Sequence, residues 1–170
     1  MEYKKSIRLK GYDYRADGYY FVTICTNCRK KIFEPRISAK FGHKLAQYVV
    51  AGPWPAICKK YSDTVETNIK DIENKFSAEI DFYCIMPEHI HMVIILTARR
   101  GRAATNLSWI INAFKGWCTR KFGESIWQPN YYEHIIRNEK ALDKVRKYIE
   151  NNPVAEKIEW SAIYELENIN

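Results

Sequence analysis

Three short runs of aromatic, β-branched and aliphatic residues predict strands. They are residues 19–25 (YYFVTIC), 80–86 (IDFYCIM) and 89–96 (HIHMVIIL). Such residues fit the pleated, half-buried surface of a sheet. Only Pro87 and Glu88 separate the second run from the third, which predicts an antiparallel hairpin. The third run is apolar on both faces after its start, so it should be a central strand.

Helical spacing of apolar residues marks two further parts of the chain. From residue 38 to about residue 75 the pattern is helical but interrupted by Gly-Pro-Trp-Pro at 52–55. Because proline does not fit a helix interior, we expect two or more helices there. Residues 106–122 place their apolar positions on one side of a helix, and Gly123 should end it.

The last third of the chain predicts one more strand and one more helix. Residues 126–137 look like an irregular strand interrupted at Pro129, and Asn138 can cap a helix that runs to about residue 152. The resulting order is strand, helices, strand, strand, helix, strand, helix. This order favours an α+β fold in which one antiparallel sheet carries helices on one face, close to the ferredoxin-like plan. We expect a single domain over 1–170.

Composition and charge narrow the classes of function. The chain has 170 residues, 46% of them hydrophobic, and a net charge of +7, which excludes a disordered or collagen-like chain. Its longest aliphatic run, 92–96, is far shorter than the roughly 20 residues of a membrane span. No apolar stretch resembles a secretory signal, so we expect a cytoplasmic protein. The basic excess favours a polyanionic partner, most simply nucleic acid.

The cysteines leave open one alternative that involves zinc. Their odd number, five, argues against a disulfide framework in an intracellular protein. Cys25 and Cys28 form a CxxC motif, and a zinc site built from this pair with His89 and His91 is possible. The chain has no second CxxC motif, so thiols within and just after a strand are the simpler interpretation.

Two pairs of residues are candidates for catalysis. His89 and His91 are two apart on a strand and share a face, so both imidazoles can reach one metal ion. Tyr148 and Asn152 are four apart on the last predicted helix and also share a face. A nearby divalent cation can make a tyrosine hydroxyl competent to attack phosphorus, and an amide oxygen suits a hard cation. The ordinary alternative is a core tyrosine and a helix-ending asparagine.

A third group mixes basic, polar and aromatic residues between the strands and helices of the second half. Such a mixture suits a groove for a single nucleic-acid strand, in which charges follow the phosphates and rings stack on bases. The alternative is a solvated helix face and core aromatics. His134 and Arg146 lie among these residues. The predicted DNA contacts are Lys115, Arg120, Lys121, Trp127, Gln128, Tyr131, Tyr132, Arg137, Lys144 and Lys147.

The motifs together resemble the single-tyrosine transposase branch of the HUH endonuclease superfamily. Residues 86–91 (MPEHIH) are similar to the family's MPNHxH segment, with Glu88 in place of asparagine. Residues 148–153 (YIENNP) resemble its nucleophile motif YIxxNP. Asparagine followed by proline is typical of the REP-associated tyrosine transposases, whereas insertion-sequence transposases usually carry glutamine. Residues 38–77 match the family least well.

The resemblance implies a metal-dependent enzyme that cleaves and rejoins single-stranded DNA at or near hairpins. His89, His91 and Asn152 would hold Mg²⁺ or Mn²⁺, and Tyr148 would form a 5′-phosphotyrosine intermediate. The protein would work in the cytoplasm at the nucleoid, as a monomer or a homodimer. A domesticated DNA- or RNA-binding regulator that keeps the fold but no longer cuts is the main alternative.

Overall fold

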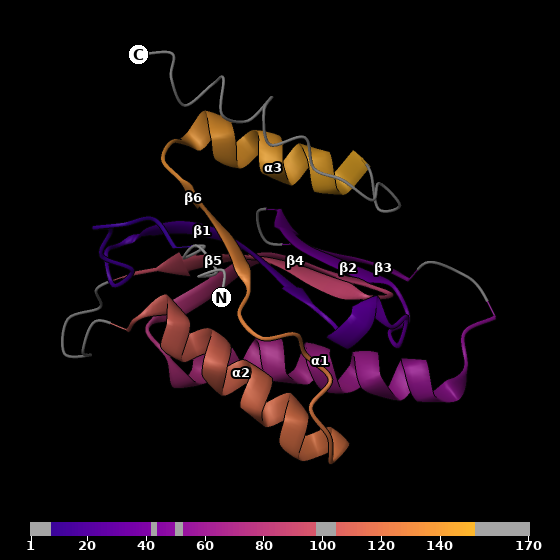
Figure 1. The fold of residues 1–170 in the computed structure, drawn as a ribbon. Coiled ribbons are helices and arrows are strands. Elements are labelled where there is room, and N and C mark those ends of the chain that lie inside the picture. Colours follow the sequence, from indigo (N-terminus) through magenta and orange to yellow (C-terminus); the bar gives the residue numbers. More distant parts are fainter. Residues whose placement is uncertain (1–7, 42–43, 50–52, 98–104, 152–170) are drawn as a thin grey trace.

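One antiparallel sheet of six strands forms the centre of the part of the chain that the structure describes (Figure 1). The computed structural model describes residues 8–41, 44–49, 53–97 and 105–151, with the backbone alone for 38–49 and 148–151. The sheet order is β3-β2-β4-β5-β1-β6. The strands are β1 (Gly18–Cys25), β2 (Arg36–Phe41), β3 (Lys44–Val49), β4 (Ala78–Met86), β5 (His89–Leu96) and β6 (Tyr132–Ile136). The helices are α1 (Ala56–Lys75), α2 (Leu107–Phe122) and α3 (Glu139–Asn151), with a short 3₁₀ turn, η1 (Asn27–Arg29).

The predicted central hairpin is confirmed. β4 and β5 pair antiparallel from Ala78 opposite Leu96 to Met86 opposite His89. β1 pairs along the other side of β5, so β5 is hydrogen-bonded on both edges. This central place explains why its sequence is apolar on both faces.

The helical prediction for the segment after residue 38 is wrong in its first half. Residues 36–41 and 44–49 form the hairpin β2–β3, and α1 is the helix that follows the proline-containing segment. Residues 36–41 (RISAKF) alternate strictly between polar and apolar residues, which is the two-residue period of a strand. β2 also pairs with β4, so tertiary hydrogen bonding reinforces this local pattern.

Helices cover both faces of the sheet, so the expectation that all helices share one face is also wrong. Figure 1 shows α1 and α2 below the sheet and α3 above it. Each face has its own apolar cluster. The larger one contains Tyr20, Val22 and Ile24 of β1, and the smaller one contains Phe21 of the same strand. A sheet that is apolar on both faces must be covered on both, and α3 supplies the second cover.

Local capping fixes where α2 begins and ends and where α3 begins. The Asn106 side chain accepts a hydrogen bond from the Ser108 amide at 2.8 Å, and Gly123 ends α2 with a φ of 77°. The Asn138 Oδ1 accepts from the Ala141 amide at 2.8 Å, as its cap position predicts. β6 begins only at Tyr132, because Pro129 interrupts the preceding segment, which has one isolated bridge between Trp127 and Thr26. No helix among the described residues is long and apolar enough to cross a membrane.

Candidate active site

The two histidines of β5 converge on the face of the sheet that α3 covers. His89 Nε2 and His91 Nε2 are 3.0 Å apart, and the two rings meet edge to face with centroids 4.6 Å apart. Strand alternation places both side chains on the face of Val93, which belongs to the apolar cluster under α3. The prediction that both imidazoles point to one place is therefore confirmed by the geometry.

Two residues of β1 hold the His91 ring in place. Thr23 lies opposite His91 across the strand pair, and its Oγ1 is 2.8 Å from His91 Nδ1. The Phe21 ring packs against the imidazole with centroids 5.1 Å apart. Burial lowers the pKa of His91 to about 3, helped by the charges of His89 and Arg29. The ring is therefore neutral near pH 7, the form that can offer a nitrogen lone pair to a metal ion.

The donor pair fits a divalent cation. Two imidazole nitrogens that each lie about 2.1 Å from one ion, with their two bonds to the ion at right angles, would be about 3.0 Å apart. This is the separation of the two Nε2 atoms. The proposed third ligand, Asn152, lies outside the described residues.

The zinc alternative is wrong. Cys25 lies beside His89 in the strand pairing, whereas Cys28 is exposed in η1. Among the described side chains, no three histidine, cysteine or acidic groups come close enough to hold a metal ion. Cys25, Cys28, His89 and His91 therefore do not assemble into one site among the described side chains.

The helix that contains Tyr148 packs on the same face of the sheet as the histidines. Ala141, Leu142 and Val145 of α3 are buried in one cluster with Phe21 of β1. Because Phe21 also contacts the His91 ring, a single apolar cluster connects α3 to the histidine pair. Tyr148 belongs to α3, and its side chain lies outside the described part.

Two aromatic residues predicted to stack on bases are buried in the core, and that prediction is wrong for both. Trp127 packs against Phe33 and Phe114, with ring centroids 5.5 Å and 5.8 Å away. Tyr131 lies under the Arg8 guanidinium, whose central carbon is 3.6 Å from the ring centroid. Large aromatic surfaces stabilise most when they are removed from water, and the ordinary core alternative holds here.

Lys115 binds backbone oxygens of its own chain. Its ammonium group donates to the carbonyl of Gln128 at 2.8 Å and to that of Asn130. Burial lowers the pKa of Lys115 to about 8, and the charge of Arg8 adds to this effect. In this conformation Lys115 orders the irregular segment before β6.

The remaining predicted DNA contacts do not form one stripe. Arg120 and Lys121 are exposed near the end of α2, whereas Lys144 and Lys147 are exposed on α3, across the sheet. Arg137 and Tyr132 are exposed around β6, with 56% of Tyr132 accessible, and Gln128 is half-buried. Of these residues, Lys144 and Lys147 belong to the helix that covers the face of the histidines (Figure 1).

Sequence reasoning missed Thr23, Phe21 and Asp81 of the histidine face. Thr23 and Phe21 owe their roles to the register between β1 and β5, which the residue pattern of one strand does not reveal. The signal for Thr23 was a polar residue within an otherwise apolar run. Asp81 accepts two hydrogen bonds from Arg146 of α3. Arg146, which lies among the residues predicted to form the nucleic-acid groove, is thus held by a carboxylate of its own chain.

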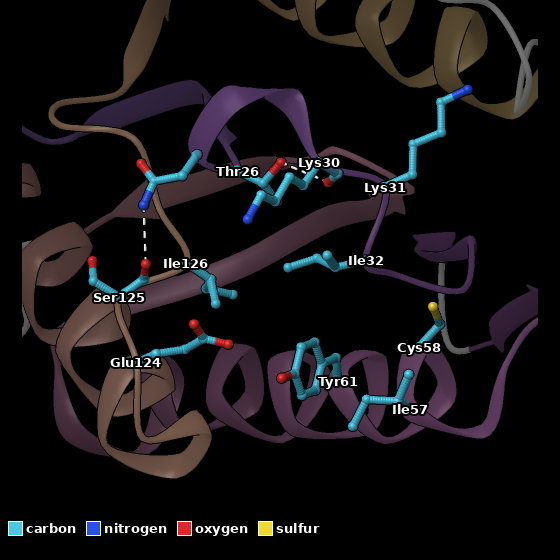
Figure 2. Close-up of a pocket in the computed structure, with 11 residues that line it drawn as sticks. Thr26, Lys30, Lys31, Ile32, Ile57, Cys58, Tyr61, Glu124, Ser125 and Ile126 are labelled. Atoms are coloured by element: carbon cyan, nitrogen blue, oxygen red, sulfur yellow. Dashed lines mark hydrogen bonds between the residues drawn. The ribbon is translucent and has the colours of Figure 1, made fainter.

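Figure 2 shows a cavity of about 350 Å³ whose lining includes neither histidine. Residues after β1, at the start of α1 and after α2 line it, among them Lys30, Ile57 and Ser125. None of the predicted site residues lines this cavity. It does not contribute to the candidate active site.

Comparison with known proteins gives concordant matches. The family model described as "Transposase IS200 like" matches residues 54–152. A Haemophilus influenzae protein without a functional name is 33% identical over 91% of this chain and 90% of its own. A second H. influenzae protein, which its name assigns provisionally to the REP-associated tyrosine transposases, is 32% identical over 84% of this chain and 73% of its own. The solved structure of a REP-associated tyrosine transposase bound to a REP hairpin has the same fold, with a TM-score of 0.58, 23% identity and coverage of 91% of this chain and 73% of its own.

Proposed function

The chain belongs to the IS200-like transposase family, and from this premise we propose that it is a metal-dependent nuclease and strand transferase for single-stranded DNA. The family places the chain among DNA-processing transposases. The finer proposal rests on one observation above the others. Two imidazole Nε2 atoms, 3.0 Å apart, lie on the sheet face that is covered by the helix containing Tyr148.

Tyr148 is the proposed nucleophile. Position 148 follows Val145 by three residues and Ala141 by seven, which is the spacing of one stripe along a helix. Ala141 and Val145 are buried toward the sheet. This spacing supports the choice of Tyr148, since position 148 continues the stripe of α3 that packs on the sheet.

The proposed metal ligands are His89, His91 and Asn152, and the ion is Mg²⁺ or Mn²⁺. The neutral His91 imidazole and the convergence of the two Nε2 atoms support this assignment. A bound divalent ion would polarise the scissile phosphate and offset the negative charge that builds on its oxygens. Thr23 and Phe21 contribute by holding the His91 ring at a fixed angle.

The proposed reaction conserves the number of phosphodiester bonds. The Tyr148 hydroxyl oxygen bonds to phosphorus and releases its proton to solvent, while the bond from phosphorus to the 3′ oxygen breaks. That oxygen takes up a proton and leaves as a free 3′-OH, and the phosphate remains on Tyr148 as a 5′-phosphotyrosine. Attack by a 3′-OH on this bond reverses the step and joins strands. No nucleotide cofactor is required.

Hairpin DNA is the proposed substrate, and the protein would act at the nucleoid. The support is the solved relative, which is bound to a REP hairpin. We propose that Lys144 and Lys147, which are exposed on α3, meet strand phosphates near the histidine face. We propose that the remaining exposed basic residues contact flanking DNA, and that the protein works as a monomer.

The test is a covalent-adduct assay with labelled hairpin oligonucleotides taken from DNA flanking the gene, in Mn²⁺ or Mg²⁺. Wild type should form a denaturant-stable protein–DNA adduct, and Tyr148→Phe and His89→Ala should form none. Tyr61→Phe is the matched control, because it removes a hydroxyl from a tyrosine of α1, on the other face of the sheet (Figure 1), and should leave the adduct intact. Tight, salt-sensitive binding without any adduct would instead identify a non-cleaving DNA-binding protein. An adduct that persists in Tyr148→Phe would refute the assignment of the nucleophile.

A further inference from the structure

β4 contains a bulge at Asp81. Ile80 pairs with Ile94 and Phe82 pairs with Val93, so Asp81 has no partner of its own in the pairing with β5. An extra residue of this kind reverses the alternation of side chains locally. Ile80 belongs to the apolar cluster on the α1 and α2 face, whereas Phe82 belongs to the cluster under α3. Asp81 faces α3 by the ordinary alternation after Ile80, and the bulge turns Phe82 to the same side, so two consecutive residues face α3.

Asp81 uses this orientation to bind Arg146 of α3 through both oxygens. Arg146 Nε donates to Asp81 Oδ2 at 2.8 Å, and Nη2 donates to Oδ1 at 2.7 Å. The Asp81 side chain is 9% exposed and that of Arg146 is 24% exposed. A bidentate pair shielded from water fixes angles as well as distance, because the planar guanidinium matches the carboxylate in one orientation.

The other contacts of α3 that the described side chains make leave its rotation and lengthwise position less defined. Ala141, Leu142 and Val145 pack through apolar surface, which has no directional preference. The start of the helix is held by the Asn138 cap and by Tyr19, whose hydroxyl donates to Glu139 at 3.5 Å. Both of these contacts lie at the end of α3 away from position 148.

Arg146 is two residues before Tyr148, about 3 Å along the helix axis. We propose that Asp81 is a positioning residue that, by binding Arg146, sets the rotation and register of α3 and so holds Tyr148 over His89 and His91. The part of this inference that concerns catalysis rests on the proposed function. The part that concerns the docking of α3 does not.

The chain supplies a matched control. Asp143 also contacts Arg146, at 3.4 Å through Nη1, but its side chain is 60% exposed and lies on α3 itself. Asp143→Asn makes the same change of charge beside the same arginine but leaves the ion pair between α3 and β4 in place. A contact within one helix cannot fix how that helix sits on the sheet.

The experiment compares wild type, Asp81→Asn, Asp81→Glu and Asp143→Asn by two measurements. The first is amide hydrogen exchange of residues 139–151, with α1 as an internal reference. The second is the single-turnover rate of adduct formation at saturating hairpin DNA and Mn²⁺, together with the Kd for the DNA. Asp81→Asn should speed exchange in α3 and slow adduct formation by about 10- to 100-fold each, the size expected for losing a charge-assisted pair.

In the same variant the exchange of α1 should stay within about twofold of wild type, since α1 packs on the other face of the sheet (Figure 1) and does not depend on α3 register. The Kd sets the DNA concentration at which the adduct rate is read, so a weaker contact through Lys144 or Lys147 does not enter that rate. Asp143→Asn should match wild type, and Asp81→Glu should recover part of both losses. Equal α3 exchange and equal adduct rates in Asp81→Asn and Asp143→Asn would overturn the proposal. Faster exchange throughout the chain would also overturn it, because Asp81 would then support stability alone. If wild type forms no adduct, the proposed function fails, and α3 exchange still decides the docking role.

Discussion

Replacing Thr23 with valine should weaken divalent-metal binding at His89 and His91 while leaving the fold intact. For His91 Nε2 to offer a lone pair, the ring proton must sit on Nδ1, and Nδ1–H must then donate to an acceptor. Thr23 Oγ1, 2.8 Å away, is that acceptor. Valine has nearly the same shape and favours strands, but it accepts no hydrogen bond.

The size of the effect follows from the surroundings of the ring. His91 is packed against Phe21, so an Nδ1–H without its acceptor has little access to water. Leaving a buried donor unpaired costs about 1–3 kcal/mol. Loss of the partner that orients a metal-binding histidine lowers metal affinity by about 10- to 100-fold. The two figures agree, and we expect a loss of that size for Mn²⁺ in Thr23→Val.

Free Mn²⁺ measured by electron paramagnetic resonance during a titration gives the affinity directly. Thr23→Ser keeps the hydroxyl and should bind Mn²⁺ nearly as wild type does, and His91→Ala gives the limit for a lost ligand. At saturating Mn²⁺ the adduct rate of Thr23→Val should recover, since the nucleophile is unchanged. Equal Mn²⁺ affinity in wild type and Thr23→Val, with the fold intact in both, would refute the reasoning that Thr23 sets the ring for metal binding.

Three further predictions use other parts of the structure. Changing Lys144 and Lys147 to glutamine should lower the slope of log K against log salt for single-stranded DNA by about 1.4, or 0.7 for each lost phosphate contact; an unchanged slope in a binding titration would place the DNA elsewhere. Burial alone would raise the pKa of Glu66, but the hydrogen bonds it accepts outweigh this and hold its pKa below 4.5. Its contribution to stability is therefore present above pH 4.5 and lost as the pH falls through the lower folded-state pKa, so urea unfolding should show a smaller loss from pH 5 to pH 3 in Glu66→Gln than in wild type. Mixing Tyr148→Phe with His89→Ala should yield no adduct if, as we propose, each active site is built from one chain; recovery of activity in the mixture would show that α3 is exchanged between subunits.

The parts of the fold that sequence predicts well are those in which local pattern and tertiary role agree. β5 is a central strand, and its sequence is apolar on both faces. Asn138 precedes α3, and its side chain caps the first turn of that helix. The prediction failed at residues 36–49, where a segment compatible with helical spacing becomes a hairpin through pairing with β4. It also failed for Trp127 and Tyr131, since an aromatic residue beside basic ones looks the same in sequence whether it stacks on a base or fills the core.

In the candidate site, too, the sequence predicts some residues and not others. The His89–His91 pair is readable because a spacing of two on a strand fixes a shared face. Thr23 and Asp81 are not readable, since one depends on the register between two strands and the other on a bulge. Supporting residues of this kind come from pairings between distant segments, and a local pattern does not encode them.

The short connection between β6 and α3 supports the proposal that one chain supplies both the histidines and the tyrosine helix of a site. Arg137 and Asn138 alone separate the two elements, so the Cα atoms of Ile136 and Glu139 can be at most about 11 Å apart. β6 is hydrogen-bonded along β1, the strand that also pairs with β5 and its histidines. An α3 that moved to a second subunit would have to pull β6 from this sheet or lengthen the connection by melting its own first turn, where the Asn138 cap holds it. The short connection and the Asp81–Arg146 pair act at opposite ends of the helix, and together they favour assembly of the site within a single chain.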